Sequence, residues 1–357
     1  MTPDFFILDF EMQPQHVIED FNSMLWVERY NNLGMFKLVA DRRNTRLTSL
    51  TGESFIGKSD SRYFMFVDDV DDDYESGLVT VTGRTSDIIL KYRQSISPSQ
   101  YTAGKAWKMA NYPTAVAITV IRNAIQTGFT PNDGVYAIDN LSITNSAGNQ
   151  GTSDTFEIPI QESYSNMKNL LDPVNVGWRM RRTYDSLTVN FDIFMGADHS
   201  NYPADDTIVF SPNRDNFKKG VLRRRGNDYA TDGILYGSNT IYYRDSPYNF
   251  GGYGWWARVI GIDGEDIKMS DVTAAELSDM LKNRANAAFR SRLETAYIDG
   301  EVVSALPNRY VYGTDYNLGD LVLVSHDGVF ESDHRVVEHT TSVDQEGTRE
   351  FPTLEPV

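Results

Sequence analysis

Two segments near opposite ends of the chain alternate apolar or aromatic residues with polar residues around a turn. The first covers residues 25–40 (LWVERYNNLGMFKLVA) and the second covers residues 310–324 (YVYGTDYNLGDLVLV). A period of two places successive side chains on opposite faces of a strand, and Asn and Gly favour tight turns. Each segment is therefore predicted to form a β-hairpin, and neither carries a catalytic pattern.

The length of the chain predicts more than one packed unit. At 357 residues the chain exceeds what one small hydrophobic core usually serves. Its 20 Tyr and 18 Phe residues favour strands over helices. The expected architecture is therefore a set of several β-rich units.

Charge and cysteine content exclude several classes of protein. Acidic residues number 50 against 33 basic ones, which gives a formal charge of -17, whereas nucleic-acid affinity comes largely from Lys and Arg. The chain has no cysteine, which excludes disulfides and thiol catalysis and suits folding in a reducing cytoplasm. Residues 1–10 lack a basic leader, and no apolar run approaches the ~18 to 20 residues that span a bilayer.

Period-two patterns recur at both ends of the chain and predict the strands. The predicted ranges are 5–10, 24–30, 35–39, 62–67, 78–82, 178–182, 187–194, 310–312, 321–324 and 335–339. Residues 351–357 (FPTLEPV) are predicted to be a loop. The acidic run at residues 68–77 is predicted to be a solvated hairpin loop, because it lacks the calcium-loop pattern that would favour a cation site.

Three helices are predicted between these strands. Pro113 precedes a helix over residues 114–127 that Gly128 can end, and a second short helix covers residues 164–171. The third covers residues 274–297, where Thr273 and Glu276 have capping-box spacing and Gly300 ends the pattern.

No catalytic or metal-binding pattern stands out. The chain has no Gly-x-Ser-x-Gly elbow and no complete phosphate-binding loop. His326, His334 and His339 could converge on a metal, but no His-Glu-x-x-His pattern supports this, so three scattered surface histidines are the preferred interpretation. Fifty acidic residues make a carboxylate pair uninformative. No enzyme activity, metal or cofactor is predicted.

The most unusual composition lies at residues 239–256 (NTIYYRDSPYNFGGYGWW). Exposed aromatics could stack on sugars, but burial or subunit contact is favoured, because interfaces enrich the same residue types. The candidate contacts are Tyr242, Tyr243, Tyr248, Phe250, Tyr253, Trp255 and Trp256. The basic runs at residues 223–225 and at Arg179, Arg181 and Arg182 are expected to pair with carboxylates within the chain or across subunits.

Five segments together resemble the minor tail or baseplate hub proteins of siphophages, particularly those of phages that infect actinobacteria. The segments are residues 26–38 (WVERYNNLGMFKL), 79–84 (VTVTGR), 177–181 (GWRMR), 209–212 (VFSP) with Asn216, and 316–322 (YNLGDLV) followed by 334–338 (HRVVE). The resemblance covers most of the chain and rests on the order and spacing of the segments.

The resemblance implies a β-rich α+β fold with two tail-tube-like β-barrel or sandwich domains and a few helices. Residues 1–97 would form the first tube-like domain, residues 98–175 an insertion with helices, and residues 176–357 the second tube-like domain with an insertion at about 265–300. The implied relationship is to the hub proteins of contractile tails.

The implied role is a homotrimeric hub at the distal end of the tail in the virion, made in the host cytoplasm. Its expected partners are the distal tail protein ring, the tape-measure protein and central tip or fibre proteins, and viral DNA would pass through without specific binding. A carbohydrate-binding module that uses residues 239–256 is the alternative. Candidate channel or interface acids are Asp68, Asp69, Asp71, Asp72, Asp73, Glu75, Asp205 and Asp206.

Overall fold

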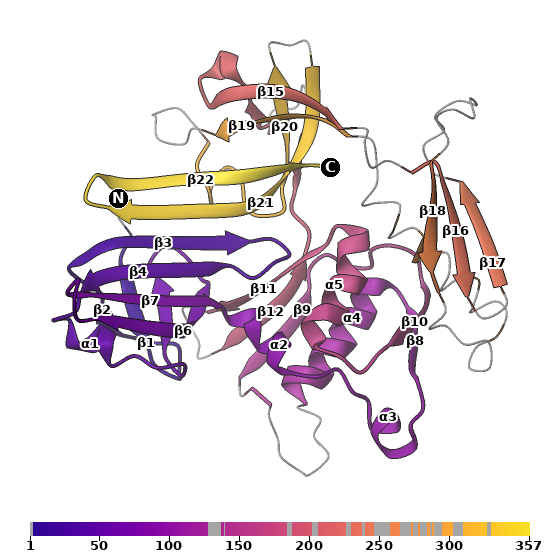
Figure 1. Cartoon of the computed structure of the whole chain (residues 1–357), viewed down its shortest axis with the longest axis horizontal. Coiled ribbons are helices and arrows are strands. Elements are labelled where there is room, and N and C mark those ends of the chain that lie inside the picture. The colour runs from indigo at the N-terminus through magenta and orange to yellow at the C-terminus, as the bar shows by residue number, and fades with distance from the viewer. Residues whose placement is uncertain are drawn as a thin grey trace.

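The chain folds into several sheets with few helices, so the predicted strand-rich α+β class is confirmed (Figure 1). The computed structural model describes residues 3–127, 137–138, 140–183, 188–201, 206–225, 230–237, 240–245, 258–264, 273, 278, 284–285, 288, 295–302, 310–326 and 330–357.

The largest described sheet contains 12 strands from both ends of the chain, in the order β13-β20-β21-β3-β4-β7-β6-β5-β1-β2, with β14 beside β20 and β22 beside β21. Strands β3 and β21 pair antiparallel, with Trp26 opposite Thr341. This pairing places strands of the first expected domain (residues 1–97) and of the third (residues 176–357) in one sheet. The strands are β1 Phe5–Leu8, β2 Pro14–Val17, β3 Phe21–Arg29, β4 Met35–Asp41, β5 Phe55–Lys58, β6 Phe64–Asp73, β7 Leu78–Thr85, β13 Asp198–His199, β14 Val209–Phe210, β20 Leu321–His326, β21 Phe330–Asp344 and β22 Gly347–Pro356.

Strands β1 to β7 and β20 to β22 form what we call the curled sheet. Lys58 on β5 lies 3.0 Å (Nζ to Oγ1) from Thr341 on β21, although four strands separate β5 from β21 in the sheet. The sheet therefore curls around its inner face. That face buries the apolar side chains Phe5, Met24, Trp26, Phe36, Leu38, Ile56, Met65, Val79 and Val81, and Leu47 of helix α1 (Thr45–Thr48) joins them.

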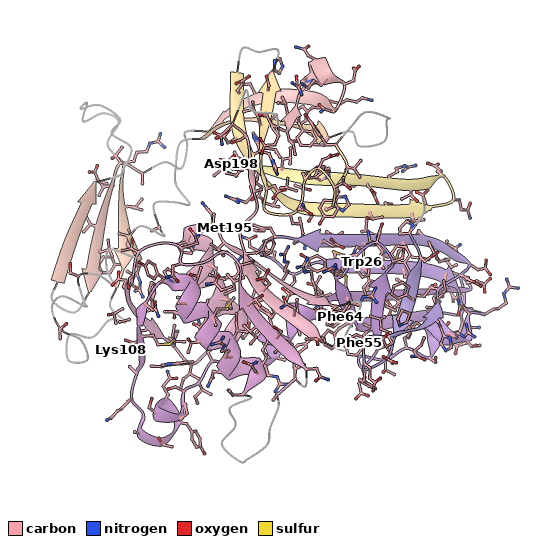
Figure 2. All side chains as sticks on the ribbon, turned by 180° about the vertical axis from the view of Figure 1, so that it is seen from behind. Trp26, Phe55, Phe64, Lys108, Met195 and Asp198 are labelled. Atoms are coloured by element: carbon pink, nitrogen blue, oxygen red, sulfur yellow. The ribbon has the colours of Figure 1, made fainter. Side chains whose placement is uncertain are left out.

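A second core lies beside the curled sheet, in what we call the helical unit. It contains the sheet β11-β12-β9, the pair β10-β8 and the helices that pack on them. Phe55 and Phe64 on the outer face of the curled sheet contribute to this core (Figure 2). The elements are η1 Ser86–Ile88, α2 Ile89–Tyr92, α3 Pro98–Ala103, β8 Trp107–Asn111, α4 Pro113–Ile121, η2 Arg122–Gln126, β9 Leu141–Asn145, β10 Asp154–Ile158, α5 Ser163–Leu171, η3 Asp172–Val174, β11 Gly177–Arg182 and β12 Val189–Phe194.

Two of the predicted helices lie in the helical unit. Pro113 is the first residue of α4, which continues as a π-helical turn through Gln126. Helix α5 ends at Leu171, directly before the turn that contains Pro173. Proline is favoured in the first turn of a helix and cannot continue one, so both predictions rest on the same property of its ring.

Tyr30 joins the two cores. Its hydroxyl donates to the carbonyls of Asn175 (3.0 Å) and Phe194 (3.3 Å), and its ring meets that of Phe194 edge to face at 5.2 Å. Gly177 and Gly319 press against the Tyr30 ring, where a Cβ atom on either residue would clash. These two glycines, each within a segment that carries the family resemblance, are therefore needed for this close approach.

Two smaller sheets lie beside these cores, and Phe217, the first residue of one of them, is buried in the core of the curled sheet. Strands β15 (Phe217–Arg225) and β19 (Thr295–Val302) pair antiparallel after the short turn η4 (Pro212–Arg214). The other sheet has the order β17-β16-β18, from Thr240–Asp245, Asp232–Gly237 and Val259–Asp263. Among the described residues, none of the helices has the length and apolar character required to cross a membrane.

Three sequence predictions about strands and loops are wrong. Residues 310–324 do not form a hairpin, because residues 310–319 form turns and a single bridge between Tyr312 and Tyr316. Residues 68–73 continue β6 instead of forming a loop, and only residues 74–77 make the turn. Residues 351–356 belong to β22, an edge strand beside β21 alone, and edge strands tolerate proline because their outward N–H groups need no partner.

The predicted helix over residues 274–297 lies mostly outside the described residues. Within it, Ser278, Arg284, Ala285 and Ala288 are helical. Strand β19 occupies the end of the range from Thr295 and includes Gly300, so the predicted C-terminal boundary is wrong.

Candidate functional site

A buried polar cluster lies at one end of the core inside the curled sheet. Glu28 is its centre, 2% exposed, and accepts hydrogen bonds from Trp26 Nε1 (2.8 Å) and from the hydroxyls of Ser61 (2.5 Å) and Tyr312 (3.1 Å). Lys58, also buried, donates to Thr341 and pairs with Asp60 at 3.1 Å. We call Trp26, Glu28, Lys58, Ser61, Tyr312, His339 and Thr341 the Glu28 cluster.

Strand periodicity and one turn assemble this cluster from four separate segments of the chain. On β3 the same face carries Met24, Trp26 and Glu28, and on β21 the facing residues include His339 opposite Glu28 and Thr341 opposite Trp26. Lys58 ends β5. Tyr312, in the turn before β20, packs against the core of the curled sheet, and its hydroxyl donates to Glu28.

His339 is held neutral inside the cluster. Its ring stacks on Tyr312 with centroids 3.7 Å apart and planes at 9°, and neither ring nitrogen has a hydrogen-bond partner. Burial, with the nearby Lys58 charge, lowers the pKa of His339 to about 3. Burial raises the pKa of Tyr312 well above its usual value, and the Glu28 carboxylate adds to this shift.

The Glu28 cluster is arranged to hold the sheet together. Three side chains donate to the Glu28 carboxylate, and the cluster joins β3, β5, β21 and the turn at Tyr312. A buried charge left without one of these partners would carry a large desolvation cost. The geometry therefore pins the two ends of the chain to each other.

The three clustered histidines do not converge. On the β20–β21 hairpin, His326 is opposite Phe330 and His334 is opposite Val322, which places the two about 13 Å apart along the strands at roughly 3.3 Å per residue. His334 and His339 are buried, each 1% exposed, so the expectation of surface histidines is wrong for both. Within the described ranges no three His, Asp or Glu side chains are grouped to hold a metal ion.

The acidic run lies on β6 and divides into two sets. Asp68 pairs with Arg84 at 2.6 Å and Asp72 pairs with Arg42 at 2.8 Å. Asp69, Asp71 and Asp73 are exposed, opposite Thr82, Thr80 and Leu78 of β7. A bulge between Val67 and Asp69 changes which side chains face outward.

The remaining candidate acids lie elsewhere. Glu75 lies in the turn after β6. Asp206 lies 3.6 Å (Oδ2 to Nδ1) from His199, whose other ring nitrogen is 3.7 Å from the buried Asp320. Asp205 lies outside the described residues. The structure therefore does not bring the eight candidate acids into one cluster.

The aromatic run is described only in part. Tyr242 and Tyr243 belong to β17, where they pair with Leu235 and Ile234 of β16. The other five candidates lie outside the described residues: Tyr248, Phe250, Tyr253, Trp255 and Trp256. Contact with a sugar or a subunit through this run stays a prediction.

The basic residues of β11 lie within the fold. Arg179 pairs with Asp192 at 3.0 Å and lies 3.9 Å above the Phe194 ring, and Arg182 donates to the carbonyl of Lys58 at 3.2 Å. Burial, with the adjacent Arg179 charge, lowers the pKa of Arg181. The expected pairing with carboxylates is confirmed for Arg179.

The sequence analysis missed a second tryptophan–carboxylate pair. Trp178 Nε1 donates to Asp87 at 2.9 Å, and both side chains are buried in the helical unit. Burial raises the pKa of Asp87. The sequence feature that could have indicated a buried Asp87 is the apolar run at residues 88–90 directly after it. A carboxylate that is buried beside such a run needs hydrogen-bond donors.

Comparisons with known proteins agree with this fold. The family model described as Siphovirus ReqiPepy6 Gp37-like protein matches residues 4–353. The tail protein from Neisseria meningitidis MC58 is 13% identical, with a TM-score of 0.61 over 99% of this chain and 97% of that chain. The 43 kDa tail protein of prophage MuSo2 from Shewanella oneidensis is 12% identical, with a TM-score of 0.62 over 99% and 98%.

A third similar structure is the prophage tail protein gp18 from Listeria monocytogenes EGD-e, at 14% identity and a TM-score of 0.55 over 99% of this chain and 94% of that chain. A search of curated proteins found no match. At these identities the likeness shows the fold, and the resemblance to siphophage tail proteins that the sequence predicts is confirmed.

Proposed function

Because the chain belongs to the Siphovirus ReqiPepy6 Gp37-like family, we propose that it is a structural protein of a siphophage tail, without enzyme activity. The observation that carries this proposal is the match of nearly the whole fold to phage and prophage tail proteins. The Glu28 cluster supports it, since its buried charges are used to fasten strands together.

In finer detail, we infer a homotrimeric hub at the distal end of the tail in the virion. A ring of three copies would connect the distal tail protein ring to central tip or fibre proteins. It would hold the tape-measure protein before infection and let viral DNA pass afterwards. Closed cyclic symmetry is the usual arrangement of such homo-oligomers.

Charge supports the passage of DNA. Three copies at -17 each would carry a formal charge of -51, which repels phosphate wherever it faces a channel. Exposed acids such as Asp69 and Asp71 are therefore suited to a channel or to a contact between subunits.

The oligomeric state tests the hub proposal. Light scattering on a sizing column should give a mass of ~120 kDa, three times the 40.4 kDa of one chain. A mass of one chain at every concentration, with and without the other tail proteins, would count against the hub.

A further inference from the structure

The pair of strands β15 and β19, which we call the basic ribbon, has an unusual composition for this chain. Five of the nine residues of β15 are basic, and none is acidic. They are Lys218, Lys219, Arg223, Arg224 and Arg225. The partner strand contributes Asp299 and Glu301, so the ribbon keeps a positive balance within a chain whose total is -17.

The described residues leave both faces of the ribbon uncovered at its middle. Val221 is 52% exposed and Leu222 is 40% exposed. Successive side chains of a strand point to opposite faces, so exposure of both means that neither face is packed at this point. Two exposed apolar side chains on a strand rich in basic residues are typical of a contact surface for an acidic partner.

The complementary surface lies on β6 of the same chain. Asp69, Asp71 and Asp73 point outward from this strand, and we call them the acidic ridge. Among the described residues Asp69 and Asp71 have no ion-pair partner, whereas their neighbours Asp68 and Asp72 are neutralised by arginines. The exposed Tyr74, 77% accessible, lies next to the ridge.

The two surfaces lie at opposite margins of the molecule. Strand β19 contacts β20, β21 and β22, and β3, β4 and β7 lie between β21 and β6 in the sheet. Figure 1 shows β15 and β19 above β22 and β6 at the lower margin of the curled sheet. One copy cannot bring the two surfaces together.

We propose that the basic ribbon of one copy docks on the acidic ridge of the next copy. Unlike surfaces on opposite margins generate a head-to-tail interface, which closes into a ring when the rotation between copies permits. The inference rests on the proposed ring-forming role and adds the surfaces through which copies recognise each other. Opposite charges would select the register, and Val221, Leu222 and Tyr74 would supply apolar contact.

Charge reversal on each surface tests the interface. The double variant Asp69→Lys, Asp71→Lys and the double variant Lys218→Glu, Arg224→Glu should each weaken self-association by about tenfold or more, because like charges then face each other. A chain with all four changes should recover association. The control Glu11→Lys, Glu53→Lys makes the same change in net charge as the Asp69→Lys, Asp71→Lys variant at exposed sites elsewhere and should associate like the wild type.

The readout is the dissociation constant from sedimentation, with circular dichroism to confirm folding. Recovery by the fourfold variant supports the ribbon–ridge contact, since a folding defect would not be repaired by a second reversal. If the wild type forms a trimer that all variants retain, the interface is wrong and the hub proposal stands.

A carbodiimide cross-link covers the case of weak association. This reagent joins amines to carboxylates that touch, and mass spectrometry of cross-linked dimers should find Lys218 or Lys219 joined to Asp69, Asp71 or Asp73. Dimers joined only at other residues would overturn the proposed contact, as would the absence of any cross-linked dimer. Association that persists unchanged at roughly 0.5 M salt would also overturn the proposed contact, because salt at that concentration screens exposed charges.

Discussion

Each of the two cores contains a buried tryptophan that donates its indole N–H to a carboxylate, but the two pairs are built differently. In the curled sheet Glu28 also accepts from Ser61 and Tyr312 and lies near Lys58 and His339. In the helical unit Asp87 accepts from Trp178 and Thr85, and burial raises its pKa. The first carboxylate joins distant strands, whereas the second lies beside local helices.

The difference reflects how far apart in the sequence the residues of each core lie. The curled sheet is closed by β21 from the far end of the chain, so its contacts have a high cost in loop-closure entropy. The helical unit forms from residues closer in sequence, and its apolar core suffices. The Glu28 cluster, which fixes the register between β3 and β21, is thus found where the two ends of the chain meet.

The largest expected effect comes from removing the two carboxylates. Glu28→Ala would leave three buried donors without their acceptor and should cost about 3–5 kcal/mol of unfolding free energy. Asp87→Ala should cost about 1–3 kcal/mol, since it leaves the buried Trp178 indole N–H and the Thr85 hydroxyl without their acceptor. Urea unfolding measures both losses. Equal losses would contradict the distinction between the cores.

The next effect is a pH dependence specific to the curled sheet. His339 titrates near 6.5 when unfolded and at about 3 when folded, so only the unfolded state gains its proton in this window as the pH falls. The wild type should therefore lose about 1.4 kcal/mol per pH unit between these values because of this group.

The variant His339→Phe keeps the stack on Tyr312 and should lack this component. Its unfolding free energy should fall less steeply than that of the wild type between pH 6 and pH 4. Parallel curves for the two proteins would show that His339 is not buried as described.

A smaller effect is expected where the two regions meet. Tyr30→Phe removes the hydroxyl that donates to the carbonyls of Asn175 and Phe194, and should cost about 1–2 kcal/mol. Hydrogen exchange should show faster opening of both units, since Tyr30 joins them. A change confined to the curled sheet would mean that the units are coupled elsewhere.

The smallest effect concerns the surface. Asp68→Asn breaks the pair with Arg84, whose side chain is 39% exposed, and should cost less than about 1 kcal/mol. The matched change Asp69→Asn should leave the thermal midpoint unchanged, because that side chain has no ion pair to lose. A larger loss for Asp69 would reverse the assignment of inward and outward acids on β6.

The sequence correctly predicts those elements in which the residue pattern and the turn or helix-end residues indicate the same structure. Residues 25–40 form the β3–β4 hairpin, with Trp26 opposite Phe36, because alternation and turn residues agree. Prolines likewise mark the start of α4 and the end of α5. The sequence predicts the first part of β6 but not residues 68–73, because their acids favour loops and the pairing with β7 overrides that preference.

The Glu28 cluster could not be predicted, because its members are up to 315 positions apart. The pairing of β3 with β21 brings Glu28 to His339, and the curling of the sheet brings Lys58 to Thr341. The same holds for β22, whose prolines indicate a loop until its position at the edge of the sheet is known. Pairing between strands that are distant in the sequence determines both the Glu28 cluster and the strand conformation of β22.

The most direct test of the central claim is to locate the protein in the virion. Gold-labelled antibodies raised against the purified chain should bind at the end of the tail farthest from the capsid. Labelling of the capsid, or virions that carry no label while the protein stays free in the lysate, would contradict a structural role in the tail.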